Sequence, residues 1–390
     1  MALLLLVLAA CQKPPQAVEV HTPVAMPSGE PGLATDAEGL AYLSWLERTA
    51  DGGQALKYAI YDRDKLGPPL DIEGGALMMA NAADVPSLLP LADGSLAAEW
   101  LSTVGGAGAY VVFVAVKRPG VPDWSEPARP NKDATLTEHG FASLIDEGSG
   151  RVGVVWLDGR NTVDARGKPQ PLGETMLMYS RLEQDGFVAE EILDRRVCDC
   201  CQTAAAATPA GLVVAYRDRA ADEIRDIVVV RREGGRWSEP KAVHADAWKL
   251  SGCPVNGPAL AARGNHLALA WYTAADDKPT VSLTLSDDGG ASFGGSRRID
   301  EGKPLGHVAV AWLDDQTAVV SWLETTAAGV VDLKLRRVGA RDLGPPMTVA
   351  AGADTHVSGF PRLAVVGRQV LLAWTDGTKP QRVRMKAVTM

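Results

Sequence analysis

The sequence predicts an all-β fold, a β-propeller of seven four-stranded blades, and three observations carry this prediction. Seven times along the 390-residue chain an aromatic residue closes a short alternating apolar run, at intervals of 51 to 60 residues. Alternation with a period of two over about six residues is typical of a half-buried strand. Four short strands per unit, repeated about every 50 residues, are the pattern of propeller blades. A ring of six blades is the alternative if one repeat is irregular.

Each repeat shows the same order of segments. A strand of small residues comes first, the aromatic-ended strand second, and a strand rich in Val and Leu third, as at residues 281–285. A turn with a large apolar residue, such as Trp124 or Trp237, then leads to a short fourth strand. We expect the closing aromatics to fill the blade cores; they are Trp45, Trp100, Trp156, Tyr216, Trp271, Trp322 and Trp374.

The two ends of the chain complement each other. The seventh repeat stops at Met390 after three strands, and residues 18–22 form an alternating segment before the first repeat. We expect this segment to supply the missing outer strand of the last blade. Residues 18–390 would then form a single closed domain without a free sheet edge.

The N-terminal residues resemble an export signal. The apolar run from Leu3 to Ala10 is far shorter than the about 20 residues that span a bilayer, and it has the size of a signal-peptide core. It ends in Leu-Ala-Ala-Cys11, which resembles the lipobox of bacterial lipoproteins, although no Lys or Arg precedes the run. The resemblance implies a signal peptide at residues 1–10, a lipidated Cys11 and a polar tether at residues 11–17. It places the protein at the bacterial cell envelope, on the periplasmic face of the outer membrane or on the cell surface.

The charge of the chain argues against one class of partner. The formal net charge is −9, with a pI of about 5.3. Nucleic-acid-binding proteins normally carry a basic surface, so we expect no nucleic-acid partner. We expect a monomer that binds a small ligand and is attached to a membrane through the lipid on Cys11.

The segment from Ser286 to Phe293 carries a family resemblance. It reads Ser-Asp-Asp-Gly-Gly-Ala-Ser-Phe, with Asp288 and Gly290 at its turn, and resembles the Asp-box of sialidases and other BNR-repeat propellers. Its role in such propellers is structural. Sialidases use three Arg for the substrate carboxylate, a Tyr–Glu nucleophile and an acid/base Asp. Their F/Y-R-I-P motif is absent here.

Topology assigns the remaining polar residues to one face. Residues that follow each second strand share a face with those that precede each first strand, and the Asp-box turn lies on the other face. Active sites of sialidases lie on the first face, at the channel mouth, so the resemblance implies a site there. The candidate catalytic residues are Asp158, Arg160, Arg217, Asp218 and Arg219, and the candidate ligand-binding residues are His139, Trp248, Asn256 and His307. The expected function is binding or hydrolysis of a glycan or another anionic ligand; a non-catalytic binding or scaffold module is the alternative.

Four cysteines remain after Cys11, and they fall on this same face. They are Cys198, Cys200, Cys201 and Cys253. In an exported protein an even number of cysteines favours disulfides, and we expect one between the 198–201 segment and Cys253. A soft metal such as copper or zinc bound by these thiols is the alternative, although the spacing matches no standard zinc pattern. No other cofactor is implied.

Overall fold

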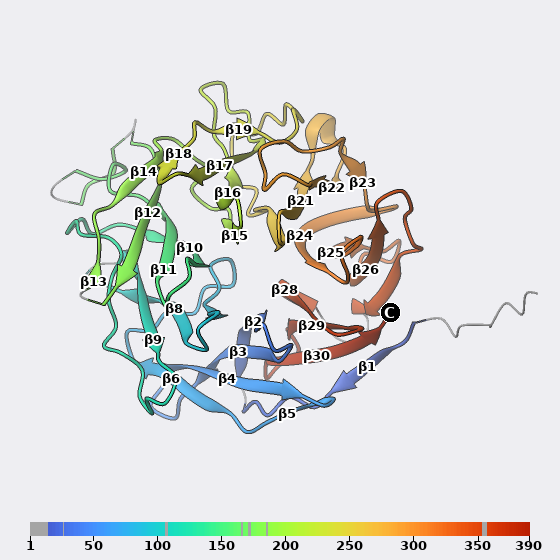
Figure 1. The fold of residues 1–390 in the computed structure, drawn as a ribbon, viewed down its shortest axis with the longest axis horizontal. Coiled ribbons are helices and arrows are strands. Elements are labelled where there is room, and N and C mark those ends of the chain that lie inside the picture. Colours follow the sequence, from blue (N-terminus) through green and yellow to red (C-terminus); the bar gives the residue numbers. More distant parts are fainter. Residues whose placement is uncertain are drawn as a thin grey trace, which may run out of the picture.

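The computed structural model of the chain describes residues 15–390, except 26, 106–107, 165–166, 171–172, 185 and 353–356. Seven antiparallel sheets stand around a central channel like the blades of a propeller (Figure 1). The prediction of a seven-bladed all-β propeller is therefore confirmed. The segment of the expected signal peptide and Cys11 lies outside the described residues.

Blades 1 to 4 follow one another along the first part of the chain. Blade 1 contains β2 (Ser28–Thr35), β3 (Ala41–Arg48), β4 (Gln54–Asp62), β5 (Lys65–Leu66) and β6 (Leu70–Gly75). Blade 2 contains β7 (Ser87–Pro90), β8 (Leu96–Thr103) and β9 (Tyr110–Lys117). Blade 3 contains β10 (His139–Asp146), β11 (Val152–Asp158), β12 (Met176–Glu183), β13 (Gly186–Phe187) and β14 (Glu191–Asp194). Blade 4 contains β15 (Ala204–Thr208), β16 (Gly211–Arg217), β17 (Ile227–Glu233), β18 (Arg236–Trp237) and β19 (Lys241–Ala242).

Blades 5 to 7 complete the ring. Blade 5 contains β20 (Ala259–Arg263), β21 (His266–Thr273), the short 3-10 helix η1 (Ala275–Asp277), β22 (Thr280–Ser286) and β23 (Arg297–Arg298). Blade 6 contains β24 (Lys303–Trp312), β25 (Thr317–Thr325), β26 (Val331–Gly339) and β27 (Met347–Ala350). Blade 7 contains β28 (Val357–Val366), β29 (Gln369–Asp376), β30 (Arg382–Thr389) and the N-terminal β1 (Ala17–Val20).

The N-terminal strand closes the ring, as the sequence predicts. β1 pairs antiparallel with β30, with Ala17 opposite Val388 and Val20 opposite Met385. Glu19 adds an ion pair of 2.9 Å to Arg384 across this junction. Because the outer edge of blade 7 is covered by the other end of the chain, unfolding of either end opens the ring.

Blade 2 differs from the expected four strands. Its sheet has three strands, and only an isolated bridge between Val114 and Ala128 stands in place of the fourth. The segment that should form this strand contains prolines at positions 119, 122, 127 and 130. Proline has no backbone N–H to donate to a ladder, so pairing stops after one bridge.

The repeated aromatics fill the blade cores. Trp45, Trp156, Trp271, Trp322 and Trp374 are fully buried. The turn aromatics pack onto the preceding blade, since Trp237 meets Tyr179 edge-on with ring centroids 5.1 Å apart. Side chains of this size contribute most of the apolar burial that holds adjacent blades together.

The Asp-box forms the β22–β23 corner of blade 5. The Ser286 hydroxyl donates to Asp288 at 2.8 Å and accepts from the Gly290 N–H at 2.9 Å. Asp288 accepts from both the N–H and the hydroxyl of Ser292, and these bonds lower its pKa. Gly290 has φ +82°, and Phe293 packs against the core of blades 4 and 5.

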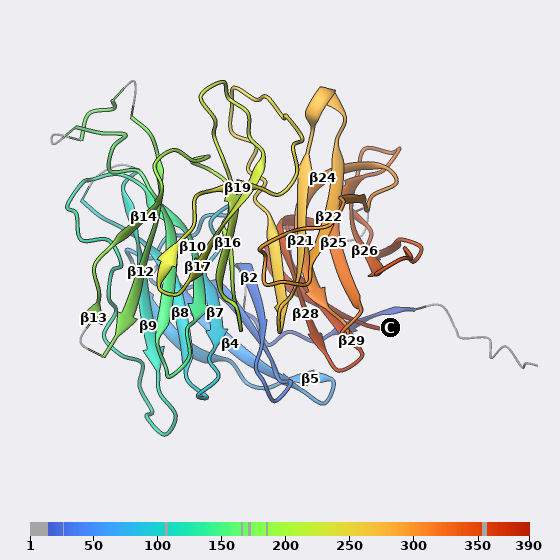
Figure 2. The same cartoon turned by 45° about the horizontal axis from the view of Figure 1, so that its top comes forward.

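The strand directions place this corner and the loops that carry the candidate site on opposite faces. Ser286 lies opposite Leu267 near the β20–β21 turn, whereas Cys253 precedes β20. In Figure 2 the β11–β12 connection and the short β21–β22 connection with η1 rise on one side of the ring. Within the described residues, no helix is long and apolar enough to span a membrane.

Candidate functional site

A cavity of about 370 Å³ occupies the channel, and the inner strands of all seven blades line it. Most of the lining is Ala, Val, Leu and Gly. Its polar lining residues are Asp84, Ser87, Ser143, Gln202, Thr203 and Arg362.

Strand register explains which residues face each other around the channel. In every blade one inner-strand residue pairs with the residue just before the closing aromatic. The inner members are Gly32, Ser87, Ser143, Ala204, Ala259, Ala309 and Arg362, and their partners are Ser44, Glu99, Val155, Ala215, Ala270, Ser321 and Ala373. Small residues occupy nearly all of these positions. Arg362 and Glu99 are the two long charged exceptions.

Arg362 projects a guanidinium group into the cavity lining without a partner. It forms no hydrogen bond or ion pair with any residue that the structure describes, although it lies deep in the propeller. Burial lowers its pKa, and the electrostatic fields of Glu99 and Asp84 oppose this effect. Arg362 is partly exposed, toward the cavity that it lines, and a guanidinium held this deep without a partner favours the binding of an anion.

Two carboxyl groups lie near Arg362, and both are buried. Asp84 accepts a 2.7 Å hydrogen bond from the backbone N–H of Phe141, in the next blade. Burial nevertheless raises the pKa of Asp84 to about 7. Burial also raises the pKa of Glu99 well above its usual range, and one Glu99 carboxyl oxygen has no hydrogen-bond partner among the described residues.

The balance of charge in this cavity therefore favours an anionic ligand. The two carboxyl groups resist ionisation, whereas an Arg side chain remains protonated in proteins. Asp84 has a pKa suited to exchange a proton near neutral pH. The cavity thus combines an anion-binding group with a candidate acid/base.

At the mouth, side chains link neighbouring blades. Asn256 accepts from the His307 N–H at 2.8 Å and donates to the Leu305 carbonyl at 3.2 Å. The His307 ring bonds to the Gly359 carbonyl at 2.6 Å and stacks on Phe360, and burial lowers its pKa. Asn256 and His307 thus hold blades 5, 6 and 7 together beside the cavity.

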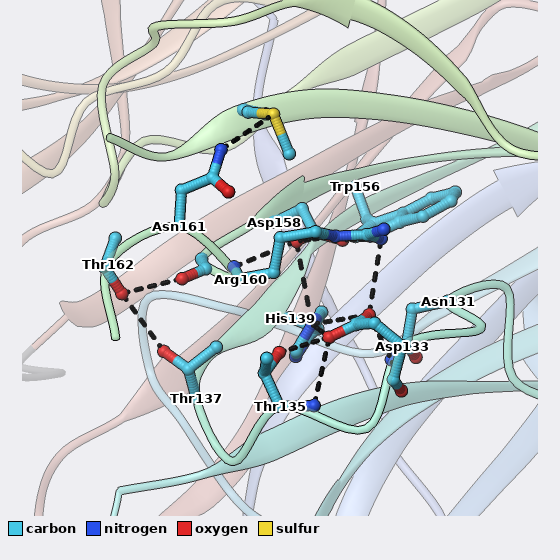
Figure 3. A network of polar contacts seen from close by, with 12 residues as sticks. Asn131, Asp133, Thr135, Thr137, His139, Trp156, Asp158, Arg160, Asn161 and Thr162 are labelled. Atoms are coloured by element: carbon cyan, nitrogen blue, oxygen red, sulfur yellow. Dashed lines mark hydrogen bonds and ion pairs between the residues drawn. The ribbon is translucent and has the colours of Figure 1, made fainter. Parts of the chain in front are cut away.

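The candidate acid Asp158 lies in a dense network on blade 3 (Figure 3). It is fully buried and accepts from the Trp156 indole at 2.8 Å. Arg160 donates two hydrogen bonds to the Asp158 carboxylate, from Nε at 2.8 Å and from Nη2 at 2.6 Å. It also forms ion pairs with Glu190 at 3.0 Å and Asp133 at 3.3 Å. Asp158 and Arg160 are thereby brought together, as expected, but their charges neutralise each other.

His139 completes this network. Its Nε2 lies 3.2 Å from Asp133 and 3.6 Å from Asp158. Burial lowers its pKa, but the bond to Asp133 and the charge of Asp158 outweigh burial, so the net pKa is raised. The arrangement favours a protonated His139 that holds the loop of Asp133 against blade 3.

Arg217 and Trp248 are packed inside blade 4 and its long loop. Arg217 is almost fully buried and donates to the carbonyls of Asn256, Arg225 and Tyr272 at 2.8, 2.5 and 2.7 Å. Its guanidinium carbon lies 4.9 Å from the centroid of the buried Trp248 ring. Arg217, expected to be catalytic, and Trp248, expected to bind ligand, therefore make their contacts within the protein.

Asp218 and Arg219 lie farther out on the same rim. Arg219 forms a two-point ion pair with Glu223, with Nε–O distances of 3.1 Å, which raises the pKa of Arg219. Burial raises the pKa of Asp218 to about 6. Neither residue lines the channel cavity.

The cysteine cluster contains one disulfide. It joins Cys200 to Cys253, while Cys198 and Cys201 are buried free thiols. The Sγ atoms of Cys198, Cys200 and Cys201 all lie within 4.8 Å of one another. In this oxidised form Cys200 is not a free thiolate, so the metal alternative would require the disulfide to be reduced.

Sequence reasoning missed the cavity-lining residues Asp84 and Arg362 and their buried neighbour Glu99. The repeat alignment contains a signal for two of them. Glu99 directly precedes Trp100, where the other six repeats have Ser, Val or Ala. Arg362 occupies a position filled elsewhere by Gly, Ser or Ala. A long charged residue among small ones at a channel-facing position indicates a functional or strained site.

No sequence family matches the chain, and no curated protein matches it. Solved structures show the same fold. The BP39L lectin from Burkholderia pseudomallei aligns with a TM-score of 0.60 and 11% identity, covering 93% of this chain and 96% of that chain. An ulvan lyase of polysaccharide lyase family PL25 aligns with a TM-score of 0.53 and 14% identity, over 96% and 94% of the two chains. The NanB sialidase from Streptococcus pneumoniae aligns with a TM-score of 0.48 and 10% identity, over 95% and 69%. The chain is thus a seven-bladed propeller that resembles glycan-active propellers in fold and matches no sequence family.

Proposed function

We propose that the channel cavity binds an anionic glycan. The observation that carries this proposal is the unpartnered Arg362 guanidinium, which lines the cavity beside two carboxyl groups that resist ionisation. A sugar carboxylate or sulfate supplies the negative charge that Arg362 lacks, and Arg binds such groups through two parallel N–H bonds.

Asp84 is the candidate general acid or base for cleavage of the bound glycan. With a pKa of about 7 it can hold or release a proton at neutral pH, as a general acid or base must. Reaction at a uronic acid or another acidic sugar held by Arg362 is therefore the preferred activity. The structural neighbours lend support, because the ulvan lyase was solved with -[GlcA(1-4)Rha3S]- bound, an acidic and sulfated glycan.

A non-catalytic lectin is the second candidate. Asp158, the candidate acid of blade 3, is held in an ion pair with Arg160, and one structural neighbour is a lectin. In this case Arg362 binds the same class of ligand, but Asp84 only stabilises the fold, through its hydrogen bond with the Phe141 N–H.

The test measures binding and turnover separately. Wild type, R362Q and D84N are titrated by calorimetry with uronate-containing and neutral oligosaccharides of equal length. The exposed Arg341 supplies the control R341Q. We expect binding of the uronate oligosaccharides alone, a loss of at least tenfold in R362Q and no change in R341Q. Equal affinity of R362Q and wild type would overturn the proposal.

Product formation then separates enzyme from lectin. Oligosaccharides incubated with wild type should give new chain ends, detected by mass spectrometry, and D84N should bind without producing them. Binding without any cleavage by wild type favours the lectin.

We also propose that the protein is exported and anchored through a lipidated Cys11. The support is the sequence Leu-Ala-Ala-Cys11 after an apolar run. Intact-mass analysis of the membrane fraction should show a mature chain that begins at Cys11 with a diacylglycerol-type adduct. A soluble mature form that retains residues before Cys11 would contradict this.

A further inference from the structure

Four sulfur atoms lie together at the entrances of blades 4 and 5. Cys200 and Cys253 form a disulfide, and the Cys253 end of it is exposed. Sγ of the buried Cys198 lies 3.8 Å from Sγ of Cys200 and 3.3 Å from Sγ of Cys201. A buried thiol therefore touches a disulfide on one side and a second thiol on the other.

The surroundings of Cys198 favour its thiolate form. Its hydrogen bond with Cys201, then the backbone N–H of Cys200 and the charges of Arg225 and Arg217, lower the pKa of Cys198 to about 6 against the effect of burial. Nη1 of Arg225 lies 3.2 Å from Sγ of Cys198. Burial raises the pKa of Cys201, so Cys201 keeps its proton. The thiolate is the nucleophile in thiol–disulfide exchange, and Cys198 is placed to act as one.

We propose that the four cysteines form a relay that carries the electrons of the buried dithiol to the protein surface, where they reduce a disulfide of another molecule. Cys198 attacks Sγ of Cys200, forms a Cys198–Cys200 bond and releases Cys253 as a thiolate. Cys201 then attacks Sγ of Cys198 and forms a Cys198–Cys201 bond, while its proton passes to Cys200, which is released as a thiol. Cys198 and Cys201 have the C-x-x-C spacing of redox dithiols.

The exchange with the outside molecule completes the reaction. The exposed Cys253 attacks the outside disulfide, forms a mixed disulfide and releases one outside thiol. Cys200 then attacks Sγ of Cys253, restores the Cys200–Cys253 bond and releases the second outside thiol. The dithiol of Cys198 and Cys201 is oxidised, one outside disulfide is reduced, and the two protons of the dithiol leave on the outside thiols.

Local charge indicates which disulfides fit. The Asp199 carboxylate lies within 4.8 Å of the sulfurs of Cys200 and Cys253, and Asp199 is exposed. Burial and, to a lesser degree, the charge of Asp199 raise the pKa of Glu138, so Glu138 lies near Asp199. The Asp199 carboxylate beside the reacting sulfur attracts a cationic disulfide and repels an anionic one.

Cystamine, a small cationic disulfide, is therefore the probe. Folded wild type, C198S and C201S are incubated with it, quenched with acid and alkylated, and their disulfides are mapped by peptide mass spectrometry. Metal content is measured on the same samples. Circular dichroism and thermal unfolding establish that each variant is folded.

Each variant stops the relay at a different step. Wild type should consume one cystamine per chain and gain a Cys198–Cys201 bond without a lasting adduct. C201S can free Cys253 but cannot resolve the adduct, so it should hold cysteamine on Cys253. C198S cannot open the disulfide, so its Cys253 adduct should be at least tenfold lower. If C198S fails to fold, R225Q in the C201S background keeps Cys198 and should slow the trapping, whereas R225K should largely restore it.

Three results would overturn the proposal. The first is an equal Cys253 adduct in C198S and C201S, or in R225Q and its C201S parent if C198S does not fold. The second is a wild type that never forms the Cys198–Cys201 bond. The third is a zinc or copper ion bound at one per chain that keeps the thiols unreactive.

Discussion

Replacement of Asp84 by Asn tests the electrostatics of the channel directly. The amide keeps an oxygen that accepts the Phe141 N–H but cannot ionise. The pKa of Asp84 is about 7 in the folded protein, against 3.8 for an ordinary Asp. Between these two pH values the unfolded chain releases the proton and the folded chain retains it. The folded state therefore binds more protons, and wild-type stability falls as the pH rises through this window.

The magnitude follows from the size of the shift. A shift of this size corresponds to about 4 kcal/mol, lost by wild type between pH 4 and pH 8 and not lost by D84N. At about 2.1 cal/mol/K of unfolding entropy per residue, this equals a change of about 5 °C in Tm for a chain of 390 residues.

The assay is thermal unfolding of both proteins at pH 5 and pH 8. The Tm of D84N minus that of wild type should rise by several degrees from the lower to the higher pH. Any pH-independent cost of the amide cancels in this comparison, and D222N, at an exposed loop position, should show no such trend. A difference that is equal at both pH values would refute the assignment of a buried, proton-retaining Asp84.

Three further predictions concern the fold and the rim. C253S removes a disulfide between residues that are 53 positions apart in the sequence. Urea unfolding should show that the free energy of unfolding falls by about 4 kcal/mol, while the circular dichroism spectrum of the propeller persists. An unchanged unfolding midpoint would contradict a stabilising disulfide. W322A removes a fully buried indole and should destabilise blade 6 by about 3 to 5 kcal/mol in the same assay. W124A removes a partly buried indole and should cost less than half as much. D133N removes the negative charge that helps to raise the pKa of His139, so the NMR titration midpoint of His139 should fall. The stability that His139 contributes is present at low pH and is lost as the pH rises through its folded pKa, and in D133N this loss should begin at a lower pH.

The fold could be predicted because one physical pattern repeats seven times. An aromatic residue that ends a buried strand has the same neighbours in every blade. The spacing of these aromatics along the sequence therefore gives the length and the number of the blades. Closure by residues 17–20 followed from counting strands in the last repeat. Blade 2 departs from the pattern because its proline-rich corner cannot pair, and proline content alone does not show which pairings survive.

The candidate site was harder to predict because residue type does not reveal partners. Asp158, the carboxylate two residues after the closing Trp156, was expected to serve catalysis. In three blades the carboxylate at this position accepts the indole N–H of the Trp, as Glu47, Asp158 and Glu324 do at 3.1, 2.8 and 3.0 Å. Such a bond recurs with the repeat because a buried indole N–H is stabilised by an acceptor, although the Trp374 indole N–H has none among the described residues.

Arg217 and Arg362 differ in whether the protein supplies partners for the guanidinium group, and this difference distinguishes a structural Arg from a candidate ligand-binding Arg. Both guanidinium groups lie deep in the protein, and both belong to strands next to the channel mouth. Arg217 donates to three backbone carbonyls, so its charge is stabilised by the chain itself. Arg362 has no such partner among the described residues, and its neighbours Asp84 and Glu99 are held toward their neutral forms. The folded chain therefore keeps one positive charge in the channel that its own side chains do not neutralise, and an anionic ligand is what would neutralise it.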